Sequence, residues 1–356
     1  MNPDTGKKHL ANISGMSNRV SVIVLNYNGK HLLEECIDSI LGQTYKEIEI
    51  IVVDNGSTDG SADLLNQKYK DRIRLILNET NLGFAEGNNV GIAAASGKYI
   101  ALLNNDAVAD PQWIEELVHA AEDSDGTFGM WASKIMFYDS RKIIDTAGHL
   151  IYPDGLNRGR GKGEADSGQY DRKEEVFFPS GCAALYSKGM LDVISGFDSD
   201  FFAYGDDTDI GLKARLAGWK CLFVPTSVVY HKSSATSGKY SSFKAYLVER
   251  NRIWILIKYF PLPDIFLSIF YTILRYVMQA YGALSGKGAA GRFVEGASKT
   301  ELIKVLFRAY CDAFAKFPVM LKKRREFKRY VKVSSADFHL WLKRFKISAK
   351  EISLRD

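Results

Sequence analysis

The fold is decided by the stretch Lys98-Tyr99-Ile100-Ala101-Leu102-Leu103-Asn104-Asn105-Asp106. Its continuous apolar run predicts a strand covered on both faces, as in a parallel sheet. In open α/β sheets, ligands bind beyond the carboxyl ends of the strands, which is where Asp106 would lie. A carboxylate at that place suits a divalent cation that also holds phosphate oxygens. The alternative is a plain polar turn closed by Asp110 and Pro111.

Strand and helix patterns alternate along the first hundred residues. Apolar runs at 20–25, 48–53 and 73–77 predict strands, and apolar positions at helical spacing in 31–41 and 61–69 predict helices between them. This alternation predicts an α/β fold with a mostly parallel sheet flanked by helices.

The loops after the predicted strands are rich in amide and carboxylate groups. Neither a Gly-x-Gly-x-x-Gly loop after the first strand nor a Gly-Lys-Ser/Thr loop entering a helix is found. As single residues these polar groups are more typical of turns and helix caps. At successive strand ends they predict one nucleotide pocket, because such groups pair with the polar edges of a base or ribose. The residues are Asn26, Asn28, Asp54, Asn55, Asn81 and Asn88.

Two further segments carry candidate chemistry. Three carboxylates, Asp206, Asp207 and Asp209, fall in the first turn of a predicted helix, where they complement the helix dipole. Since capping needs fewer, one of them is a candidate general base. A strand at 221–230 leads to His231, which is either structural or, if it faces Asp106, a metal ligand.

Five motifs together resemble the family 2 glycosyltransferases, in order over about residues 20–259. The closest branch is the rhamnosyltransferase-like one, which is also similar to galactofuranosyltransferases. The resemblance implies a GT-A fold, a nucleoside-diphosphate sugar donor and inversion at the anomeric carbon. The motifs are Val-Ile-Val-Leu-Asn-Tyr-Asn, Ile-Val-Val-Asp-Asn-Gly-Ser-Thr-Asp-Gly-Ser, Asn-Leu-Gly-Phe-Ala-Glu-Gly-Asn-Asn, Leu-Leu-Asn-Asn-Asp and Phe-Asp-Ser-Asp-Phe-Phe-Ala-Tyr-Gly-Asp-Asp-Thr-Asp-Ile.

The resemblance also implies roles for individual residues. Asp54 would face the nucleobase, Asp106 would be the last residue of a metal-binding Asp-x-Asp, and His231 would bind the same Mg²⁺ or Mn²⁺. Asp207 matches the Asp of a catalytic Glu-Asp pair and would be the general base. Two positions depart from the family pattern, because Asn104 replaces the first Asp of the metal motif and Asp206 replaces the Glu.

The complete expected site has three parts. Asp207 is catalytic, and Asp106 with His231 binds metal. Gly181 and Asp206 lie on the acceptor side. The nucleotide sugar meets Asn26, Asn28, Asp54, Asn81, Asn88, Asn104 and Asn105.

The expected activity is transfer of a sugar, rhamnose-type first, in the synthesis of cell-surface polysaccharide. The donor would be linked to dTDP or UDP, and the acceptor would be a saccharide or a lipid-linked saccharide. One alternative is a galactofuranosyl or other UDP-sugar transferase. Another is a non-catalytic glycosyltransferase-like subunit, which Asn104 keeps open.

The two parts of the chain differ in charge. Residues 1–231 hold 22 Lys and Arg against 33 Asp and Glu, a net charge of −11, whereas residues 232–356 hold 25 against 9, a net of +16. We therefore expect the C-terminal part to meet an anionic surface. We divide the chain into a flexible lead-in at 1–19, the catalytic domain at 20–260 and a helical basic region at 261–356.

The helical basic region predicts membrane association rather than nucleic-acid binding. Its apolar run at 265–278 is interrupted by Arg275 and is too short to span a bilayer, so it is either interfacial or packed on the catalytic domain. Four separated cysteines fit a reducing compartment. We expect a peripheral enzyme on the cytoplasmic face of the cell membrane, and we leave a homodimer open. The basic cluster is Lys316, Lys322, Lys323, Arg324, Arg325, Lys328, Arg329 and Lys332.

Overall fold

The computed structural model describes residues 18–232, 241–288, 291–292 and 299–355. The strands are β1 (Val20–Asn26), β2 (Ile48–Asp54), β3 (Arg74–Leu77), β4 (Tyr99–Leu103), β5 (Ala107–Ala109), β6 (Phe128–Phe137), β7 (Ile144–Thr146), β8 (His149–Ile151), β9 (Asn157–Gly159), β10 (Glu174–Val176), β11 (Ala183–Ser187) and β12 (Lys220–His231). The helices are α2 (Lys30–Leu41), α3 (Ser61–Tyr69), α4 (Gly83–Ala94), α5 (Trp113–Glu122), α6 (Lys188–Ile194), α7 (Asp206–Leu216), α8 (Ser242–Tyr259), α9 (Leu262–Ser285), α11 (Lys299–Ala315), α12 (Phe317–Phe327), α13 (Ser335–Arg344) and α14 (Ala349–Leu354), with the 3-10 turns η1 (Ser199–Phe201) and η2 (Lys328–Tyr330).

One large sheet runs through the first two-thirds of the chain, in the order β10-β12-β6-β11-β4-β1-β2-β3, with β5 on β12 and β7 on β6. The pairings make β1, β2, β3, β4, β6 and β12 run in one direction, and β5, β7, β10 and β11 in the other. The expected α/β fold with a mostly parallel sheet is therefore confirmed.

Helices cover both faces of this sheet. Apolar side chains of α2, α3 and α5 form one core cluster with one face, and those of α4, α6, α7 and α8 form the other cluster with the opposite face. The decisive apolar run lies centrally as β4, in which all five residues are buried. Residues 104–106 leave the sheet at its carboxyl end, as expected.

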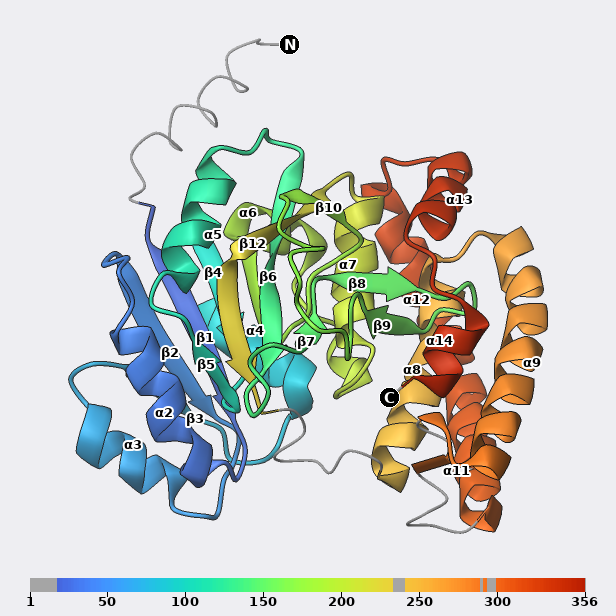
Figure 1. Ribbon diagram of the computed structural model, residues 1–356, viewed down its shortest axis with the longest axis horizontal. Coiled ribbons are helices and arrows are strands. Elements are labelled where there is room, and N and C mark those ends of the chain that lie inside the picture. The colour runs from blue at the N-terminus through green and yellow to red at the C-terminus, as the bar shows by residue number, and fades with distance from the viewer. Residues whose placement is uncertain (1–17, 233–240, 289–290, 293–298, 356) are drawn as a thin grey trace.

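The C-terminal helices stand beside the sheet, as Figure 1 shows. The expected boundary near residue 260 falls between α8 and α9, and the division into separate domains stays a prediction. Among the described residues, no helix combines the length and apolar character needed to cross a membrane.

Candidate active site

The two expected metal ligands lie together at the carboxyl edge of the sheet. Residue Ala107, directly after Asp106, begins β5, which pairs antiparallel with β12 so that Ala107 is opposite His231. This register brings Nε2 of His231 to 3.3 Å from Oδ1 of Asp106. Two adjacent ligands of one octahedral ion lie about 3 Å apart, given bond lengths of about 2.1 Å. The pair therefore fits a shared divalent cation.

A third residue, Asp145 on β7, completes this cluster. Its Oδ2 lies 2.7 Å from Nδ1 of His231, and its Oδ1 lies 2.9 Å from Nζ of Lys162. Burial opposes the ionisation of Asp145, but His231 and the charge of Lys162 outweigh it and hold the pKa of Asp145 well below its usual range. An ionised carboxylate on Nδ1 fixes the ring and directs Nε2 toward Asp106.

These side chains alone would not complete the coordination of a metal ion. In the part of the chain that the structure describes, no three His, Cys, Asp or Glu side chains are grouped to hold an ion. Asp106 and His231 would supply two ligands, so oxygens of a diphosphate and water have to supply the others.

The candidate base, Asp207, is the second residue of α7. Oδ1 of Asp207 accepts a hydrogen bond from the backbone N–H of Gly181 over 2.9 Å. Burial raises the pKa of Asp207 to about 6, against the opposing effect of this hydrogen bond. Burial, together with the charge of Asp207, raises the pKa of Asp206 well above its usual value. A carboxylate with a pKa near neutrality suits general base catalysis.

The third carboxylate of this turn, Asp209, has a structural role. It is fully buried and binds Lys258, the hydroxyl of Tyr259 at 2.5 Å and Lys213 at 3.3 Å. These partners take Asp209 out of the set of candidate bases.

The loop before α7 is strained and is held from α8. Phe202, Tyr204 and Gly205 all have positive φ, and such strain persists where the surroundings enforce it. Nδ2 of the buried Asn251 donates to the carbonyl oxygens of Phe201 at 2.9 Å, Ala203 at 3.0 Å and Tyr204 at 2.6 Å. Asn251 therefore positions the segment that delivers Asp206 and Asp207.

The two halves of the site meet through one dipeptide. Gly181 holds Asp207, and the carbonyl of the next residue, Cys182, accepts the backbone N–H of Asn104 at 2.9 Å. Asn104 belongs to the loop that ends in Asp106. The antiparallel pairing of β11 with β4 thus fixes Asp207 relative to the Asp106–His231 pair.

The expected nucleotide-binding residues fall into three separate sets. Nδ2 of Asn26 donates to Asp54 at 2.9 Å, and Nδ2 of Asn105 donates to Oδ1 of Asn26 at 2.8 Å, so these buried side chains bind one another. Asn28 lies close by with φ 50°, and its Oδ1 accepts the backbone N–H of Thr58.

Of the remaining three, Asn104 donates its backbone N–H to Cys182 as described above, and Asn81 and Asn88 bind other groups of the surrounding loops and of α4. Oδ1 of Asn81 accepts from Asn55 at 2.9 Å, and Nδ2 of Asn88 donates to the carbonyl of Phe84, one turn earlier in α4. These contacts organise the loops that surround the site, and direct contact of the residues with a nucleotide stays a prediction.

Two functional candidates were missed in the sequence. Asp145 stands in a three-residue strand without a motif, and its contact with His231 spans 86 positions. Asn251 stands in the middle of α8, in a helical pattern that reads as ordinary. Asn251 is one of four consecutive polar residues, 249–252, and nothing in the local pattern distinguishes it from its neighbours.

Comparison with known proteins finds a family model that matches part of the chain. Residues 21–195 match the family model described as "Glycosyl transferase family 2". An uncharacterized glycosyltransferase of Haemophilus influenzae is 44% identical over 108 residues, which cover 30% of this chain and 33% of that protein. Glycosyltransferase GlyG of Streptococcus pneumoniae is 38% identical over 112 residues, covering 31% and 37%. The chain thus spans about a third of the length of these relatives.

Solved structures share the fold at low identity. The mannosyltransferase PcManGT of Pyrobaculum calidifontis, in complex with GDP-Man and Mn²⁺, is 18% identical with a TM-score of 0.50, covering 91% of this chain and 88% of that one. GalNAc-T7 with UDP, GalNAc and Mn²⁺ is 17% identical with a TM-score of 0.57, covering 84% and 55%. These likenesses agree with a GT-A fold.

Proposed function

We propose, from the match of residues 21–195 to the glycosyl transferase family 2 model, that this protein transfers a sugar from a nucleoside-diphosphate sugar to an acceptor hydroxyl. The observation that carries the proposal is the joining of Asp207 to the Asp106–His231 pair through Gly181 and Cys182. A base and a diphosphate-binding cluster held in fixed positions relative to each other are what a single displacement requires.

Asp207 would take the proton of the acceptor hydroxyl as its oxygen attacks the anomeric carbon. The bond from that carbon to the diphosphate oxygen breaks as the new glycosidic bond forms, so the configuration inverts. The raised pKa of Asp207 makes it a stronger base than an exposed carboxylate, while Gly181 keeps one oxygen in place. Such general base catalysis is typically worth about 10²–10⁴-fold in rate.

Asp106 and His231 would hold a Mg²⁺ or Mn²⁺ ion, with Asp145 orienting the imidazole. A bound divalent ion would neutralise the charge that develops on the departing diphosphate. Two neighbours by fold, PcManGT and GalNAc-T7, were crystallised with Mn²⁺. Because Asn104 adds no charge, we expect the ion to bind weakly until a donor brings its diphosphate.

The finer assignment follows the sequence resemblance. The donor would be a dTDP- or UDP-linked sugar, rhamnose-type first and galactofuranose-type second. The acceptor would be a saccharide or lipid-linked saccharide of a cell-surface polysaccharide, met on the cytoplasmic face of the cell membrane. PcManGT and GalNAc-T7 were solved with GDP-Man and UDP, respectively, which supports a nucleoside-diphosphate donor of some kind.

The test begins with a thermal-shift screen of nucleotide sugars with Mn²⁺ or Mg²⁺, since a ligand at 100 times its Kd adds about 2.7 kcal/mol of stability. Release of nucleoside diphosphate is then measured with each stabilising donor. Asp207→Asn should lower kcat by about a hundredfold or more while the donor still stabilises the protein. A wild-type protein that binds donors but never releases diphosphate would instead be a non-catalytic subunit, and one that neither binds nor turns over any donor contradicts the proposal.

A further inference from the structure

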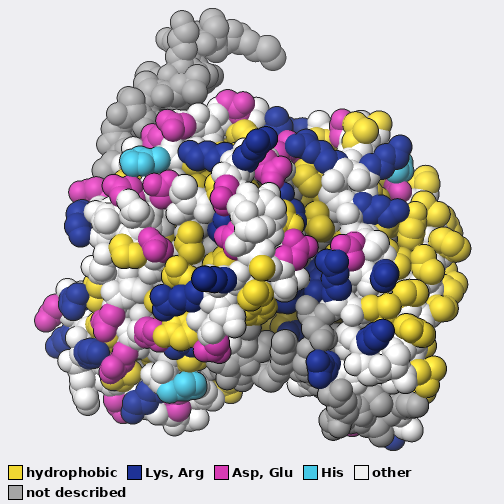
Figure 2. All heavy atoms as spheres, viewed as in Figure 1, with side chains coloured by type: hydrophobic (Ala, Val, Ile, Leu, Met, Phe, Trp, Pro, Cys, Tyr) yellow, Lys and Arg dark blue, Asp and Glu magenta, His cyan; other side chains and the backbone are white. Residues whose placement is uncertain are grey.

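Helix α9 is amphipathic in the reverse of the usual sense. Its buried positions include Asp264, Ser268, Thr272 and Arg275, which recur every three or four residues along one side. Ten large apolar side chains of α9 are exposed on the opposite side, among them Phe266 at 72% and Leu284 at 75%. Figure 2 shows hydrophobic side chains gathered along the edge of the molecule where Figure 1 places α9. A helix on the surface of a soluble protein normally buries its apolar side and exposes its polar side.

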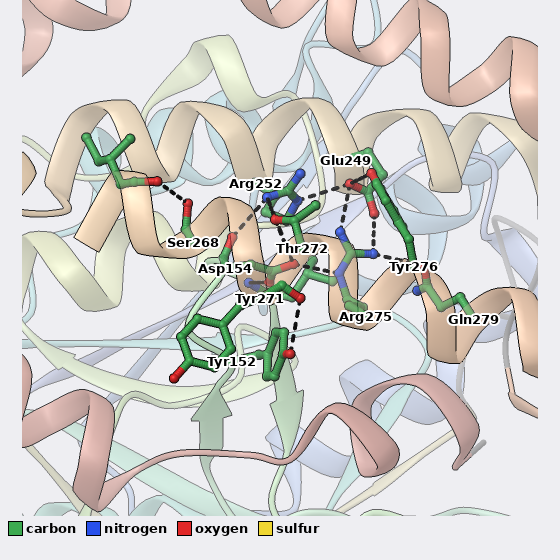
Figure 3. Close-up of polar contacts among 12 residues, drawn as sticks. Tyr152, Asp154, Glu249, Arg252, Ser268, Tyr271, Thr272, Arg275, Tyr276 and Gln279 are labelled. Carbon is green, nitrogen blue, oxygen red and sulfur yellow. Dashed lines mark hydrogen bonds and ion pairs between the residues drawn. The ribbon is translucent and has the colours of Figure 1, made fainter. Parts of the chain in front are cut away.

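A buried ion network holds the polar side inward. Arg275 is fully buried, with Nε 2.6 Å from Asp154 Oδ2 and a guanidinium nitrogen 2.7 Å from Glu249 Oε1 (Figure 3). Arg252 lies 3.0 Å from Glu249 and donates to the carbonyl of Asp154 at 3.1 Å. Turning α9 to bury its apolar side would leave these charges without partners, at a cost of several kcal/mol.

Asp154 is fully buried in the turn between β8 and β9, against Arg275. Contacts with Tyr152, whose hydroxyl donates to the carbonyl of Tyr271 at 3.1 Å, add to the attachment. The apolar side of α9 is thus held outward by the fold itself.

Cationic side chains border this surface. Lys346 lies over the ring of Tyr271 at 5.4 Å, Lys350 is exposed on α14, which packs against α9, and Lys287 is exposed just past the end of α9. Residues 261–356 hold 19 Lys and Arg against 8 Asp and Glu, a net charge of +11. In Figure 2, Lys and Arg side chains lie beside the hydrophobic edge.

The basic cluster of α12 contributes less to this surface than its sequence indicated. Lys323 pairs with Asp198 and, at 2.6 Å, with Asp200, and Arg324 donates to the carbonyl of Ile257 at 2.8 Å. These two residues attach α12 to the catalytic part of the chain. Lys322 and Arg325 remain exposed.

Charge decides between two occupants of the apolar surface. In a two-fold dimer through α9, each copy would bring its own cationic border against the other, and like charges repel. An anionic lipid leaflet instead attracts that border and accepts apolar side chains below it. A lipid surface therefore satisfies both features.

We propose that α9 is a membrane-surface helix, whose apolar side enters one leaflet while the cations around it meet anionic headgroups. This inference rests on the peripheral placement proposed above and assigns the contact to α9. The helix spans about 36 Å at 1.5 Å per residue, lying along the surface rather than across it. Since α8 carries both Glu249 and Asn251, one helix links the membrane contact to the loop that delivers Asp207. A lipid-linked acceptor would reach the site from that side.

The test compares two double variants in liposome flotation with the full-length protein. Phe266→Ser/Ile273→Ser removes two apolar groups from α9, and Leu77→Ser/Val193→Ser removes two exposed apolar groups elsewhere. All four side chains are exposed, so folding should be retained, which circular dichroism checks. Vesicles contain phosphatidylcholine with or without phosphatidylglycerol, at low and high salt. Donor hydrolysis and sedimentation equilibrium are measured on the same preparations.

The wild type and the control variant should float with anionic vesicles, less so at high salt, and the α9 variant should bind about tenfold less or weaker still. Equal flotation of both variants would assign the contact to another surface and overturn the role of α9, leaving the peripheral placement standing. A wild type that hydrolyses donor but never floats would overturn membrane binding without touching the transferase proposal. A dimer that the α9 substitutions dissociate, without flotation, would assign the surface to a second copy.

Discussion

The backbone N–H of Gly181 donates to Oδ1 of Asp207 over 2.9 Å, and nothing larger than glycine fits there. A Cβ at position 181 would lie 2.6 Å from Oδ1 of Asp207 and 3.0 Å from the ring of Phe84. The absence of a side chain at 181 is therefore part of how the base is aimed.

Gly181→Ala should displace the Asp207 carboxylate and lower kcat by about a hundredfold, since a shift of about 1 Å in a reacting group has that effect. Donor affinity should remain near that of the wild type, because the substitution removes none of the side chains expected to bind the donor or the ion. Gly189→Ala is the matched control, as its Cβ would meet no atom nearer than 3.8 Å. Steady-state kinetics of both variants check this, and an unchanged kcat in Gly181→Ala would show that the hydrogen bond does not position the base.

The pH profile should report the ionisation of Asp207. Its pKa of about 6 means that activity falls as the pH drops below 6, because the protonated carboxyl cannot accept a proton. Burial and the charge of Asp207 raise the pKa of Asp206, and we predict that Asp206 is still neutral when Asp207 ionises. Asp206→Asn keeps that neutral state and should therefore preserve the acid limb near pH 6 in kcat/KM. If the acid limb of kcat/KM moved below pH 5 in this variant, Asp206 would be ionised in the wild type and would raise the pKa of Asp207.

The metal concentration that activity requires should rise when a ligand is removed or when the His231 ring loses its orienting partner. Asp106→Ala and His231→Ala each remove a ligand, and Asp145→Ala removes only the group that orients the ring, which typically weakens metal binding about 10–100-fold. Mn²⁺ titrations of donor hydrolysis would measure the concentration at half-maximal activity, with the exposed His119→Ala on α5 as the control. Full activity in excess EDTA would refute the assigned role of the ion.

Local pattern was enough to predict the sheet and the polar edge at which Asp106 lies, since parallel strands bring their ends to one edge. The residues alone left His231 either structural or a metal ligand, and only the resemblance to the family 2 glycosyltransferases implied that it binds an ion together with Asp106. Asp145 could not be found in this way, because its place depends on a short strand whose pairing carries no periodic signal.

The orientation of α9 was beyond local pattern for a different reason. Its apolar run indicates burial, and Arg275 reads as an interruption. Ion pairs among residues 154, 249, 252 and 275 hold the polar side of α9 inward. Only the folded chain brings these residues together. A charged residue within an apolar helix can therefore either interrupt an apolar run or attach the helix through buried ion pairs. The position of its partners decides between the two.

Glu249 lies between Arg275 and Arg252 in the network beneath α9. Burial opposes its ionisation, but the charges of these two arginines lower the pKa of Glu249 from 4.5 to about 2. A carboxyl whose pKa is lowered by folding contributes stability above its usual pKa and loses it as the pH falls through the folded value. The attachment of α9 should therefore weaken between about pH 4.5 and pH 2, by about 3 kcal/mol in all.

Urea unfolding at pH 7 and pH 3, in the wild type and in Glu249→Gln, isolates this contribution. At pH 7 the variant should be less stable, because Arg275 and Arg252 lose a buried ionised partner and keep only Asp154. Between pH 7 and pH 3 the variant should lose less stability than the wild type, since it has no carboxyl at 249 to protonate. Glu326→Gln, at an exposed position on α12, should follow the wild type at both pH values. Equal losses in the wild type and Glu249→Gln would mean that the ion network does not hold α9 in place, and the outward apolar surface would then need another cause.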